Sequence, residues 1–404
     1  MEKRKDIVIV GIQPWDIEIG SNCKNIAREF AKNHRVLYVN PPMDRFTKIK
    51  SKKEERIQKR IRISKGKQSD IEEVDRNLWN LYPKRTVESI NWIGSHNIFK
   101  MLNRRNSRLL SGDIKSAISR LGFSDFLLFN DSSMFLGLHL KEFLKPKVYM
   151  YYMRDYLVKV PYWSKHGGRI EPKVLEKADL VTTNSEFFEE TSLQYNSHSY
   201  MVGQGCDVSH FSDADNSIEI PKEFKDISSP IIGYVGSLTT LRLDIELLEF
   251  IAKQRKDWSI VLVGPEDENF KKSKLHELSN VHFLGRKDEG ELPNYVKGFD
   301  IAMNPQQINN LTIGNYPRKI DEYLAMGKPI IATKTKAMEM FKDSVYLGST
   351  KEEYITLIEK ALIENSEELS RKRIQVAKSH TWVNNVAAIY NAITRATKHI
   401  YSWA

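Results

Sequence analysis

The sequence predicts an α/β protein with two doubly wound parallel sheets in two successive domains. Short apolar runs typical of buried strands alternate with amphipathic helical patterns, first from residue 7 and again from residue 229. Between the two series the chain is polar and contains prolines, as linkers do. The length of 404 residues also exceeds what one hydrophobic core usually supports.

In the first series the apolar runs predict strands, and the patterns between them predict helices. The helix at 22–33 is indicated by Ile26, Ala27, Phe30 and Ala31, which share one face. We expect strands at 7–12, 35–42, 77–83, 125–130, 147–156 and 179–185. We expect helices at 22–33, within 87–106, at 134–144, around 174–178 and from residue 186.

The second series repeats this alternation more regularly. We expect strands at 229–238, 258–265, 281–285, 300–305, 329–333 and 344–348. Helices are expected at 244–253, 291–297, from 315 to the Gly-Lys-Pro break, 351–364, 367–379 and 380–396. No short internal repeat interrupts either series.

These elements predict four segments. They are an N-terminal domain over 1–212 with a basic insertion at about 43–75, a linker over 213–229, a C-terminal domain over 230–380, and a helix within 381–404 that packs back on the N-terminal domain. Ligands of doubly wound sheets bind at the carboxyl ends of the strands. We therefore expect them in a cleft between the domains.

Composition excludes several classes of protein. The apolar share of 41% and the charged share of 28% are those of a soluble globular chain. No apolar run reaches the roughly 18 to 20 residues of a membrane span, and the short run at 7–12 predicts a first strand rather than a secretion signal. Cys23 and Cys206 are the only cysteines. This favours a reducing cytoplasm over a disulfide framework or a structural zinc site.

The net charge of +10 is unevenly distributed, because the segment 48–67 contains ten cations and two acids. Such a block suits an anionic membrane surface or a nucleic acid, although a solvated face is the more frequent outcome of a charge run. The apolar residues around Trp92 strengthen the membrane alternative, in which the protein is peripheral on the inner face of the cell membrane. Nucleic acid is the weakest alternative, because no aromatic stacking motif accompanies the block.

The stretch 314–333, GNYPRKIDEYLAMGKPIIAT, predicts a helix, a tight turn and a buried strand. If Asn315 caps the helix, Arg318 and Lys319 lie in its first turn. Cations are unfavourable at that end unless an anion is bound there. We therefore expect a phosphate in front of the helix, with Glu322 within reach of two ribose hydroxyls. A solvated surface helix is the alternative.

This stretch resembles the P-x-K-x-x-E-Y-x-A-x-G-K-P-x-I-A signature of GT-B glycosyltransferases of the family 4, or group 1, type. Other segments resemble that family in the same order: EKADLVTTNSEFFEE, VGQGCDVSHF, IGYVGSLTTLRLDIELL, VHFLGRKDEGELPNYVKGFDIAMNP and SHTWVNNVAAIY. The resemblance implies a GT-B fold and transfer of a sugar from a UDP- or GDP-sugar, without a metal or other cofactor and with retention of configuration. The implied acceptor is a glycan or a lipid-linked glycan in surface polysaccharide biosynthesis.

The resemblance also implies site residues. Glu322 matches the second acid of the family's E-x7-E motif and would hold the ribose, whereas Gly314 stands where the first acid often occurs. The family's diphosphate-binding pair after Y-V-G falls on Ser237 and Arg242, of which only Arg242 is basic. The implied donor-binding set is Gly20, Ser21, Gly236, Ser237, Arg242, Gly285, Arg286, Asn315, Arg318, Lys319 and Glu322.

For catalysis we expect Arg242 and Lys319 to stabilise the leaving diphosphate, since preorganised cations lower the barrier where charge develops. Asp155, just after an apolar strand, is the first candidate for an acceptor base. Asp16, Glu18 and His166 are further candidates, and each of these groups is about as consistent with a structural role. The string Asp213-Ala214-Asp215 follows no buried strand, so we interpret it as a chance DxD match and expect no metal site.

Two rival functions remain open. A nucleotide-sugar epimerase of the same architecture would turn over the donor without an acceptor. A non-catalytic GT-B domain that only binds its ligand is suggested by Gly314 and Ser237, which replace an acid and a cation.

Overall fold

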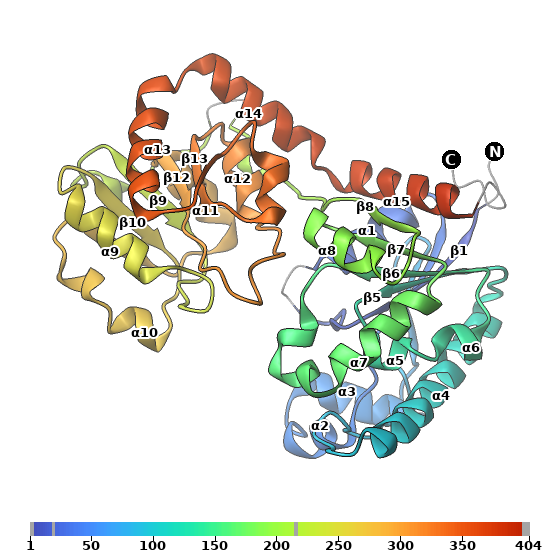
Figure 1. The fold of residues 1–404 in the computed structure, drawn as a ribbon. Helices are drawn as coiled ribbons and strands as arrows, with labels where there is room; N and C mark the ends of the chain where they lie inside the picture. The colour runs from blue at the N-terminus through green and yellow to red at the C-terminus, as the bar shows by residue number, and fades with distance from the viewer. Residues whose placement is uncertain (1–3, 18–20, 214–216, 398–404) are drawn as a thin grey trace. The chain divides into compact units, whose positions relative to one another are not determined.

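The computed structural model describes residues 4–17, 21–213 and 217–397, which fold as two α/β units (Figure 1). The N-terminal unit comprises Met1–Gly203 and Asn385–Ala404, and the C-terminal unit comprises Gln204–Asn384. The division follows Gly203, whereas the sequence places the first domain's end at residue 212. The final helix α15 (Trp382–Ala396) joins the N-terminal unit from Asn385 onward, where the Asn385 Nδ2 donates to the carbonyl oxygens of Val202 and Gly203 at 3.0 Å each.

The N-terminal unit is built on an eight-stranded sheet in the order β3-β4-β2-β1-β5-β6-β7-β8. Its strands are β1 (Asp6–Gly11), β2 (Arg35–Val39), β3 (Ile71–Asp75), β4 (Leu78–Leu81), β5 (Leu127–Asp131), β6 (Val148–Met153), β7 (Leu180–Thr183) and β8 (Ser199–Met201). All neighbours are parallel except β3 and β4, which form an antiparallel pair. The wholly parallel sheet predicted for this domain is therefore wrong at one edge. Only two residues join β3 to β4, and a parallel crossover needs about a dozen or more.

Helices cover both faces of this sheet because side chains of its strands alternate between the faces. On one face, Val8, Leu37 and Leu128 share a core with α4 (His96–Leu121) and α7 (Pro161–Lys177). On the other face, Phe30 of α1 (Asn22–Ala31) contacts Phe129 and Tyr390 of α15, at ring-centroid distances of 6.0 and 5.6 Å. The remaining helices are α2 (Arg45–Lys50), α3 (Glu55–Ser64), α5 (Met134–Gly137), α6 (Leu140–Leu144) and α8 (Glu186–Leu193).

The C-terminal unit has a parallel six-stranded sheet in the order β11-β10-β9-β12-β13-β14. The strands are β9 (Ile231–Val235), β10 (Ser259–Val263), β11 (Val281–Gly285), β12 (Ile301–Asn304), β13 (Ile330–Thr333) and β14 (Tyr346–Gly348). The helices are α9 (Ile245–Gln254), α10 (Glu268–Lys271), α11 (Leu292–Lys297), α12 (Lys319–Ala325), α13 (Lys351–Glu364) and α14 (Glu367–Ser379). Strand order reverses at β9, between β10 and β12, which makes this the place where a ligand of such a sheet binds.

Several helices differ from their predicted bounds. The region 87–106 becomes helical only at His96, where Ser95 caps α4 and accepts a hydrogen bond from the Ile98 N–H. Helix α7 begins at Pro161 rather than near 174 and contains Pro172. The basic insertion folds into α2, α3 and β3. In the described part of the chain, no helix has the length and apolar character needed to cross a membrane.

Candidate active site

The candidate site of the C-terminal unit lies at the carboxyl edge of its sheet, after β9. The backbone of Gly236 approaches α12 so closely that a β-carbon on this glycine would lie 3.3 Å from Lys319 Cε. Gly236 also has φ +144°, a conformation that favours glycine. The loop after β9 then runs beside the segment after β12, where the Gln307 N–H donates to the Arg242 carbonyl oxygen at 2.8 Å. The structure thus brings Gly236 and Lys319 together at the point where strand order reverses.

Helix α12 begins at Lys319, and Arg318 is its N-cap residue without a side-chain capping bond. The assignment of Asn315 as the cap is therefore wrong, because the Ile320 N–H pairs with the Pro317 carbonyl oxygen and helical turns start only there. The two cations nevertheless lie in the first turn, as expected. Lys319 Nζ is 5.0 Å from the centre of the Tyr234 ring.

Glu322 lies one turn into α12 and keeps only 20% of its side chain exposed. Its nearest cation is Arg318, whose Nη2 is 3.9 Å from Glu322 Oε1. Burial raises the pKa of Glu322, and Lys319 and Arg318 oppose that rise. No hydrogen bond reaches this carboxylate from any residue that the structure describes. A buried carboxylate accepts several hydrogen bonds, so this one is suited to hydroxyl donors of a ligand.

Asp321, next to Glu322, is fully buried and turned into the unit instead. Its two oxygens accept hydrogen bonds from the Tyr316 hydroxyl and from His380 Nδ1, both at 2.7 Å. Burial raises the pKa of Asp321, and the His380 hydrogen bond counters it. Asp321 therefore anchors the first turn of α12 to the segment before α15, and this fixes the direction in which Glu322 points.

The loop after residue 203 adds further groups to this turn. The Cys206 N–H donates to the His380 carbonyl oxygen at 2.8 Å, which holds the loop beside α12. The Cys206 thiol is buried, which raises its pKa, and it contacts the Arg318 side chain. Asp207 has its pKa lowered by the Ser209 hydroxyl first and also by Arg318. Arg318 Nε is buried and has no hydrogen-bond partner among the described residues.

The other predicted donor-binding residues of this unit also lie at the carboxyl edge of the sheet, but they do not contact the first turn of α12 in the way that Gly236 contacts Lys319. Ser237 and Arg242 are exposed in the loop after β9, and no side-chain hydrogen bond or ion pair engages them in the described part of the chain. Gly285, with φ +68°, and Arg286 are exposed at the end of β11, two strands away from β9. Arg242 is thus an exposed cation at this edge, with no side-chain partner among the described residues, and Ser237, Gly285 and Arg286 lie at the same edge.

The predicted residues of the N-terminal unit form a separate group. Gly20 and Glu18 lie outside the described residues. The Ser21 side chain caps α1 by accepting a hydrogen bond from the Lys24 N–H at 3.4 Å. This bond accounts for Ser21 structurally without a ligand.

Asp155 follows β6, as predicted, and its side chain is 40% exposed. Its Oδ2 is 2.6 Å from Arg154 Nη1, and the Arg154 Nε is 2.8 Å from the buried Asp131. This three-residue chain of charges crosses the carboxyl ends of β5 and β6. One oxygen of Asp155 is engaged by Arg154, and its other oxygen accepts no described hydrogen bond.

The remaining base candidates have structural partners. Asp16 pairs with Arg60 at 2.7 Å. His166 was expected in a glycine-flanked loop, but it is buried in α7, stacked on Phe99 at 3.9 Å and bonded to the Ile93 carbonyl oxygen. Gly167 and Gly168 lie within this helix rather than in a loop. Asp213 of the DxD string pairs with Lys297 at 2.7 Å.

Sequence reasoning missed Asp321, His380, Cys206 and Asp207. Asp321 adjoins the singled-out Glu322, and the SHTW segment carries His380, but no sequence spacing indicates that residues 59 positions apart will pair. A chemical signal could have pointed to Asp321: an acid on the apolar face of a predicted helix needs a buried hydrogen-bond partner.

Comparison with known proteins shows what the chain is similar to in sequence and in fold. Residues 229–378 match the family model described as "Glycosyl transferases group 1". A Bacillus subtilis strain 168 protein, TuaH, whose name assigns it to teichuronic acid biosynthesis as a glycosyltransferase, is 27% identical over 225 residues. That match covers 52% of this chain and 56% of the relative, so it spans about half of each protein.

Solved structures share the fold over nearly the whole chain. Anabaena HepE in complex with UDP gives a TM-score of 0.66 at 13% identity, covering 97% of this chain and 100% of that chain. Sucrose-phosphate synthase from Thermosynechococcus elongatus gives 0.63 at 16% identity, covering 98% and 100%. Trehalose 6-phosphate synthase from Burkholderia multivorans gives 0.67 at 10% identity, covering 98% of each. The predicted GT-B fold and the resemblance to group 1 glycosyltransferases are confirmed.

Proposed function

We propose that this chain, whose residues 229–378 match the group 1 glycosyl transferases, transfers a sugar from a nucleoside-diphosphate sugar to a glycan or lipid-linked acceptor in surface polysaccharide biosynthesis. One observation supports this most directly. The Glu322 carboxylate is largely buried and has no hydrogen bond among the described residues, and Lys319 and Arg318 lie in the same turn. This combination suits a ribose diol joined to a diphosphate.

In this proposal Lys319, Arg318 and Arg242 bind the diphosphate. The bond between the anomeric carbon and the diphosphate oxygen breaks, and its electron pair leaves with the nucleoside diphosphate. The acceptor hydroxyl oxygen forms the new bond to the anomeric carbon and releases its proton to the proposed base, Asp155. Side-chain cations stabilise the charge that develops on the diphosphate. We therefore propose a metal-independent reaction and, following the family resemblance, retention of configuration.

Asp155 stays the proposed acceptor base of the N-terminal unit. Its unengaged oxygen is available to a hydroxyl, while Arg154 orients the carboxylate. The Asp155→Asn variant should lower turnover and leave nucleotide binding unchanged. Gly236, Ser237, Gly285 and Arg286, which lie at or just after the ends of β9 and β11, remain proposed donor contacts. Ser21, the N-cap of α1, and Asn315, before α12, are proposed with them.

A UDP-sugar is the donor that we propose, with a GDP-sugar as the alternative. HepE, which shares the fold, has been crystallised with UDP and with UDP-glucose. The test is a thermal-shift screen of UDP, GDP and ADP and of their glucose conjugates against wild type and Glu322→Ala. The exposed Glu352 of α13, changed to Ala, is the matched control.

We expect one nucleotide class to stabilise the wild type and the control. At a ligand concentration 100-fold above Kd, binding stabilises the folded unit by about 2.7 kcal/mol, which raises the Tm of a unit of this size by roughly 5 to 10 °C. Glu322→Ala should lose most of the shift. A wild type that no nucleotide stabilises, or a mutant that shifts equally, would contradict the proposal. An isomerised sugar formed from the donor without acceptor would instead support the epimerase alternative.

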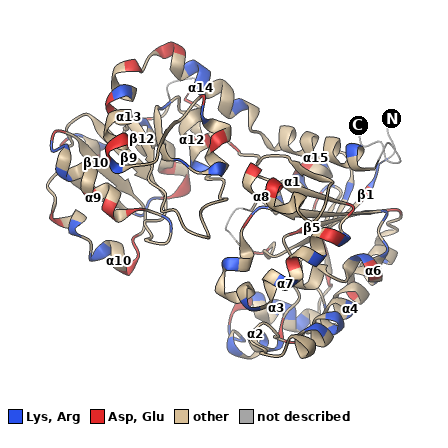
Figure 2. Cartoon of the chain, in the orientation of Figure 1, with Lys and Arg blue, Asp and Glu red and all other residues tan. Residues whose placement is uncertain are grey.

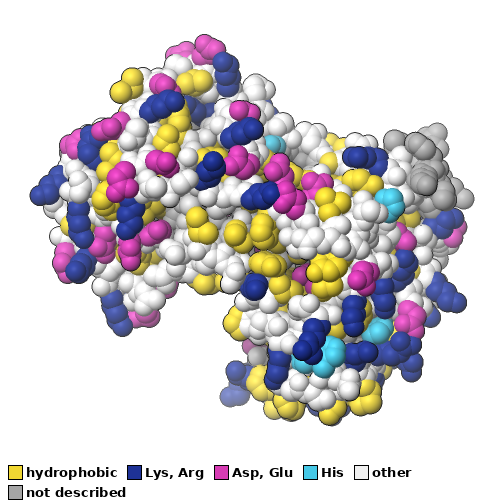
Figure 3. All heavy atoms as spheres, viewed as in Figure 1, with side chains coloured by type: hydrophobic (Ala, Val, Ile, Leu, Met, Phe, Trp, Pro, Cys, Tyr) yellow, Lys and Arg dark blue, Asp and Glu magenta, His cyan; other side chains and the backbone are white. Residues whose placement is uncertain are grey.

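We also propose that the N-terminal unit rests on an anionic membrane surface through the α2 patch, defined as residues 45–53. The patch has five cations and no acid. Phe46 and Ile49 are 60% and 74% exposed within it. Figure 2 shows Lys and Arg on α2, and Figure 3 shows cations beside hydrophobic side chains at the end of the unit where α2 lies. Exposed apolar side chains ringed by cations match a lipid surface, where each Lys or Arg contributes roughly 1 kcal/mol.

A further inference from the structure

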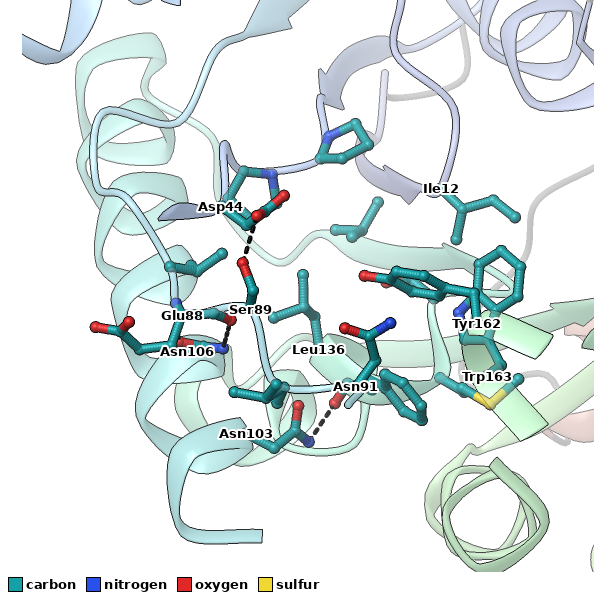
Figure 4. Close-up of a pocket in the computed structure, with 18 of the residues that line it drawn as sticks. Ile12, Asp44, Glu88, Ser89, Asn91, Asn103, Asn106, Leu136, Tyr162 and Trp163 are labelled. Carbon is teal, nitrogen blue, oxygen red and sulfur yellow. Dashed lines mark hydrogen bonds between the residues drawn. The ribbon is translucent and has the colours of Figure 1, made fainter. Parts of the chain in front are cut away.

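The N-terminal unit contains a cavity of about 300 Å³, and none of the predicted site residues that the structure describes lines it (Figure 4). It opens between the ends of β1 and β2, the segment 87–91, and helices α4, α5 and α7. In Figure 4, Asp44 and Ser89 lie on one side of it, and Tyr162 and Trp163 lie on the other. This volume is at the lower end of the roughly 300 to 1,000 Å³ of small-molecule sites. It therefore suits one small ring rather than a long chain.

In the cavity wall, the amide oxygen of Asn103 has no hydrogen-bond partner among the residues that the structure describes. Asn103 is 1% exposed, and its Nδ2 donates to the Phe135 carbonyl oxygen at 2.6 Å. Its Oδ1 is buried and accepts no hydrogen bond from any described residue. An unsatisfied buried acceptor is costly, so a hydroxyl or amide donor in the cavity would stabilise this arrangement. The neighbouring Asn106, by contrast, satisfies both ends of its amide on the backbone of Glu88 at 2.9 Å each.

The charge of the lining selects against anions. Among the residues that the structure describes, no Lys or Arg lines the cavity, whereas Asp44 does. Desolvation raises the pKa of Asp44, but hydrogen bonds from Ser89 and Thr47 outweigh it and hold the pKa below its ordinary value. Asp44 is therefore an ionised acceptor at neutral pH. Glu88, the other acid of the lining, is paired with Arg45 at 2.8 Å and Arg105 at 3.0 Å.

Aromatic and apolar side chains form most of the remaining wall. Trp163, Tyr162 and Phe135 join Ile12 and Leu136 there. Aromatic rings pack on the apolar faces of compact ligands, while a few placed polar groups fix their orientation. An uncharged sugar ring has the properties that this lining requires. Its hydroxyls can donate to Asn103 and Asp44, its flat apolar face can pack on Trp163, and it carries no negative charge.

We propose that this cavity binds the terminal sugar ring of the acceptor and that it accepts a neutral sugar while rejecting a uronate or a phosphorylated one. Asn103 Oδ1 and the Asp44 carboxylate accept hydrogen bonds from ring hydroxyls, and Trp163 packs on the ring. This assignment rests on the proposed glycosyl transfer and adds to it the chemical class of the acceptor end.

The test is saturation-transfer difference NMR on the full chain with methyl glucoside, methyl galactoside, methyl N-acetylglucosaminide and methyl glucuronide. The variants are Asn103→Ala and Trp163→Ala, with Asn97→Ala as the matched control, since Asn97 is an exposed asparagine of the same helix α4. Asn91→Ala, in the half-buried part of the wall, provides a cavity variant should Asn103→Ala fail to fold.

We expect at least one neutral glycoside to give saturation transfer with wild type and with Asn97→Ala. Binding should weaken about fivefold to tenfold in Asn103→Ala or Asn91→Ala and should weaken also in Trp163→Ala, and the glucuronide should give no signal. Equal binding of the glucuronide, equal binding by the cavity variants, or no binding of any glycoside would overturn the inference. The nucleotide thermal shift is measured on the same samples. Nucleotide binding without glycoside binding would refute the cavity assignment alone, whereas loss of nucleotide stabilisation would refute the proposed donor site.

Discussion

The His380 ring donates a hydrogen bond from Nδ1 to the buried carboxylate of Asp321 at 2.7 Å, although 59 residues separate the two in the sequence. The Tyr316 hydroxyl donates to the other oxygen of the same carboxylate at 2.7 Å. Asp321 precedes Glu322 directly, so this pair holds the turn that presents the proposed ribose-binding carboxylate. The Asp321–His380 contact therefore stabilises the turn of the proposed donor site from the side opposite Glu322.

Replacing His380 tests this support. His380→Ala leaves Asp321 with one hydrogen bond in a fully buried position, and a lost partner of a buried charged group costs about 1 to 3 kcal/mol. We expect the free energy of unfolding of the C-terminal unit, measured by urea titration, to fall by that amount. His380→Gln, whose amide can still donate, should lose less. Equal losses for the two variants would show that the hydrogen bond is not what stabilises the turn.

Lys319 should bind the diphosphate electrostatically. It forms no ion pair with any described residue, and the Tyr234 ring holds it next to Gly236. We expect Lys319→Met to weaken nucleoside diphosphate binding by about 1.5 to 3 kcal/mol in calorimetry and to reduce the dependence of binding on salt. Lys372→Met, on the exposed face of α14, is the control and should change neither quantity. A nucleoside without phosphates should bind both variants alike.

Glu171 predicts a pH-dependent stability of the N-terminal unit. It is buried in α7 and bonded to the Tyr151 hydroxyl at 2.8 Å, and burial raises its pKa from 4.5 to about 7. The folded state therefore holds this proton more tightly than the unfolded state. The contribution to stability is complete below the unfolded value of 4.5 and is lost as pH rises toward 7, by about 3 kcal/mol in all.

Urea unfolding at pH 4.5 and at pH 8 measures this loss. Glu171→Gln should remove most of the Glu171 part of the difference, because an amide does not titrate. Glu176→Gln, at an exposed position of the same helix, should keep the wild-type difference. If stability depends on pH as strongly in Glu171→Gln as in wild type, the pH dependence comes from groups other than Glu171.

The α2 patch should bind anionic vesicles. We expect the full chain to sediment with vesicles that contain phosphatidylglycerol and to remain in solution with pure phosphatidylcholine. Changing Lys48 and Lys50 to Gln should weaken binding by about 2 kcal/mol, roughly 30-fold, and Ile49→Ser should weaken it further. Ile363→Ser, at an equally exposed apolar position of α13, serves as the control. Equal binding to the two lipid compositions would contradict membrane docking by charge.

The sequence predicted best where the physics is local. The mostly apolar runs at 231–235 and 259–263 form central strands. A strand of a parallel sheet is covered by helices on both faces, so such a run is typical of it. The first turn of α12 was also predictable, since Arg318, Lys319 and Glu322 are close in sequence. Prediction failed at 71–75, where no strand was expected, and at 161–177. There, a two-residue connection and the packing of α7 on Phe99 and the sheet decide direction and length.

By itself, the sequence determined the two α/β series and the chemistry of one helix turn, because strand burial and helical spacing are properties of neighbouring residues. Only the tertiary structure decided which distant groups meet. It paired Asp321 with His380 and joined Asp155 to Asp131 through Arg154. It also left Asn103 Oδ1, in a cavity wall, without a hydrogen-bond partner among the described residues. Each of these depends on hydrogen-bond satisfaction between elements far apart in the chain, which no local pattern records.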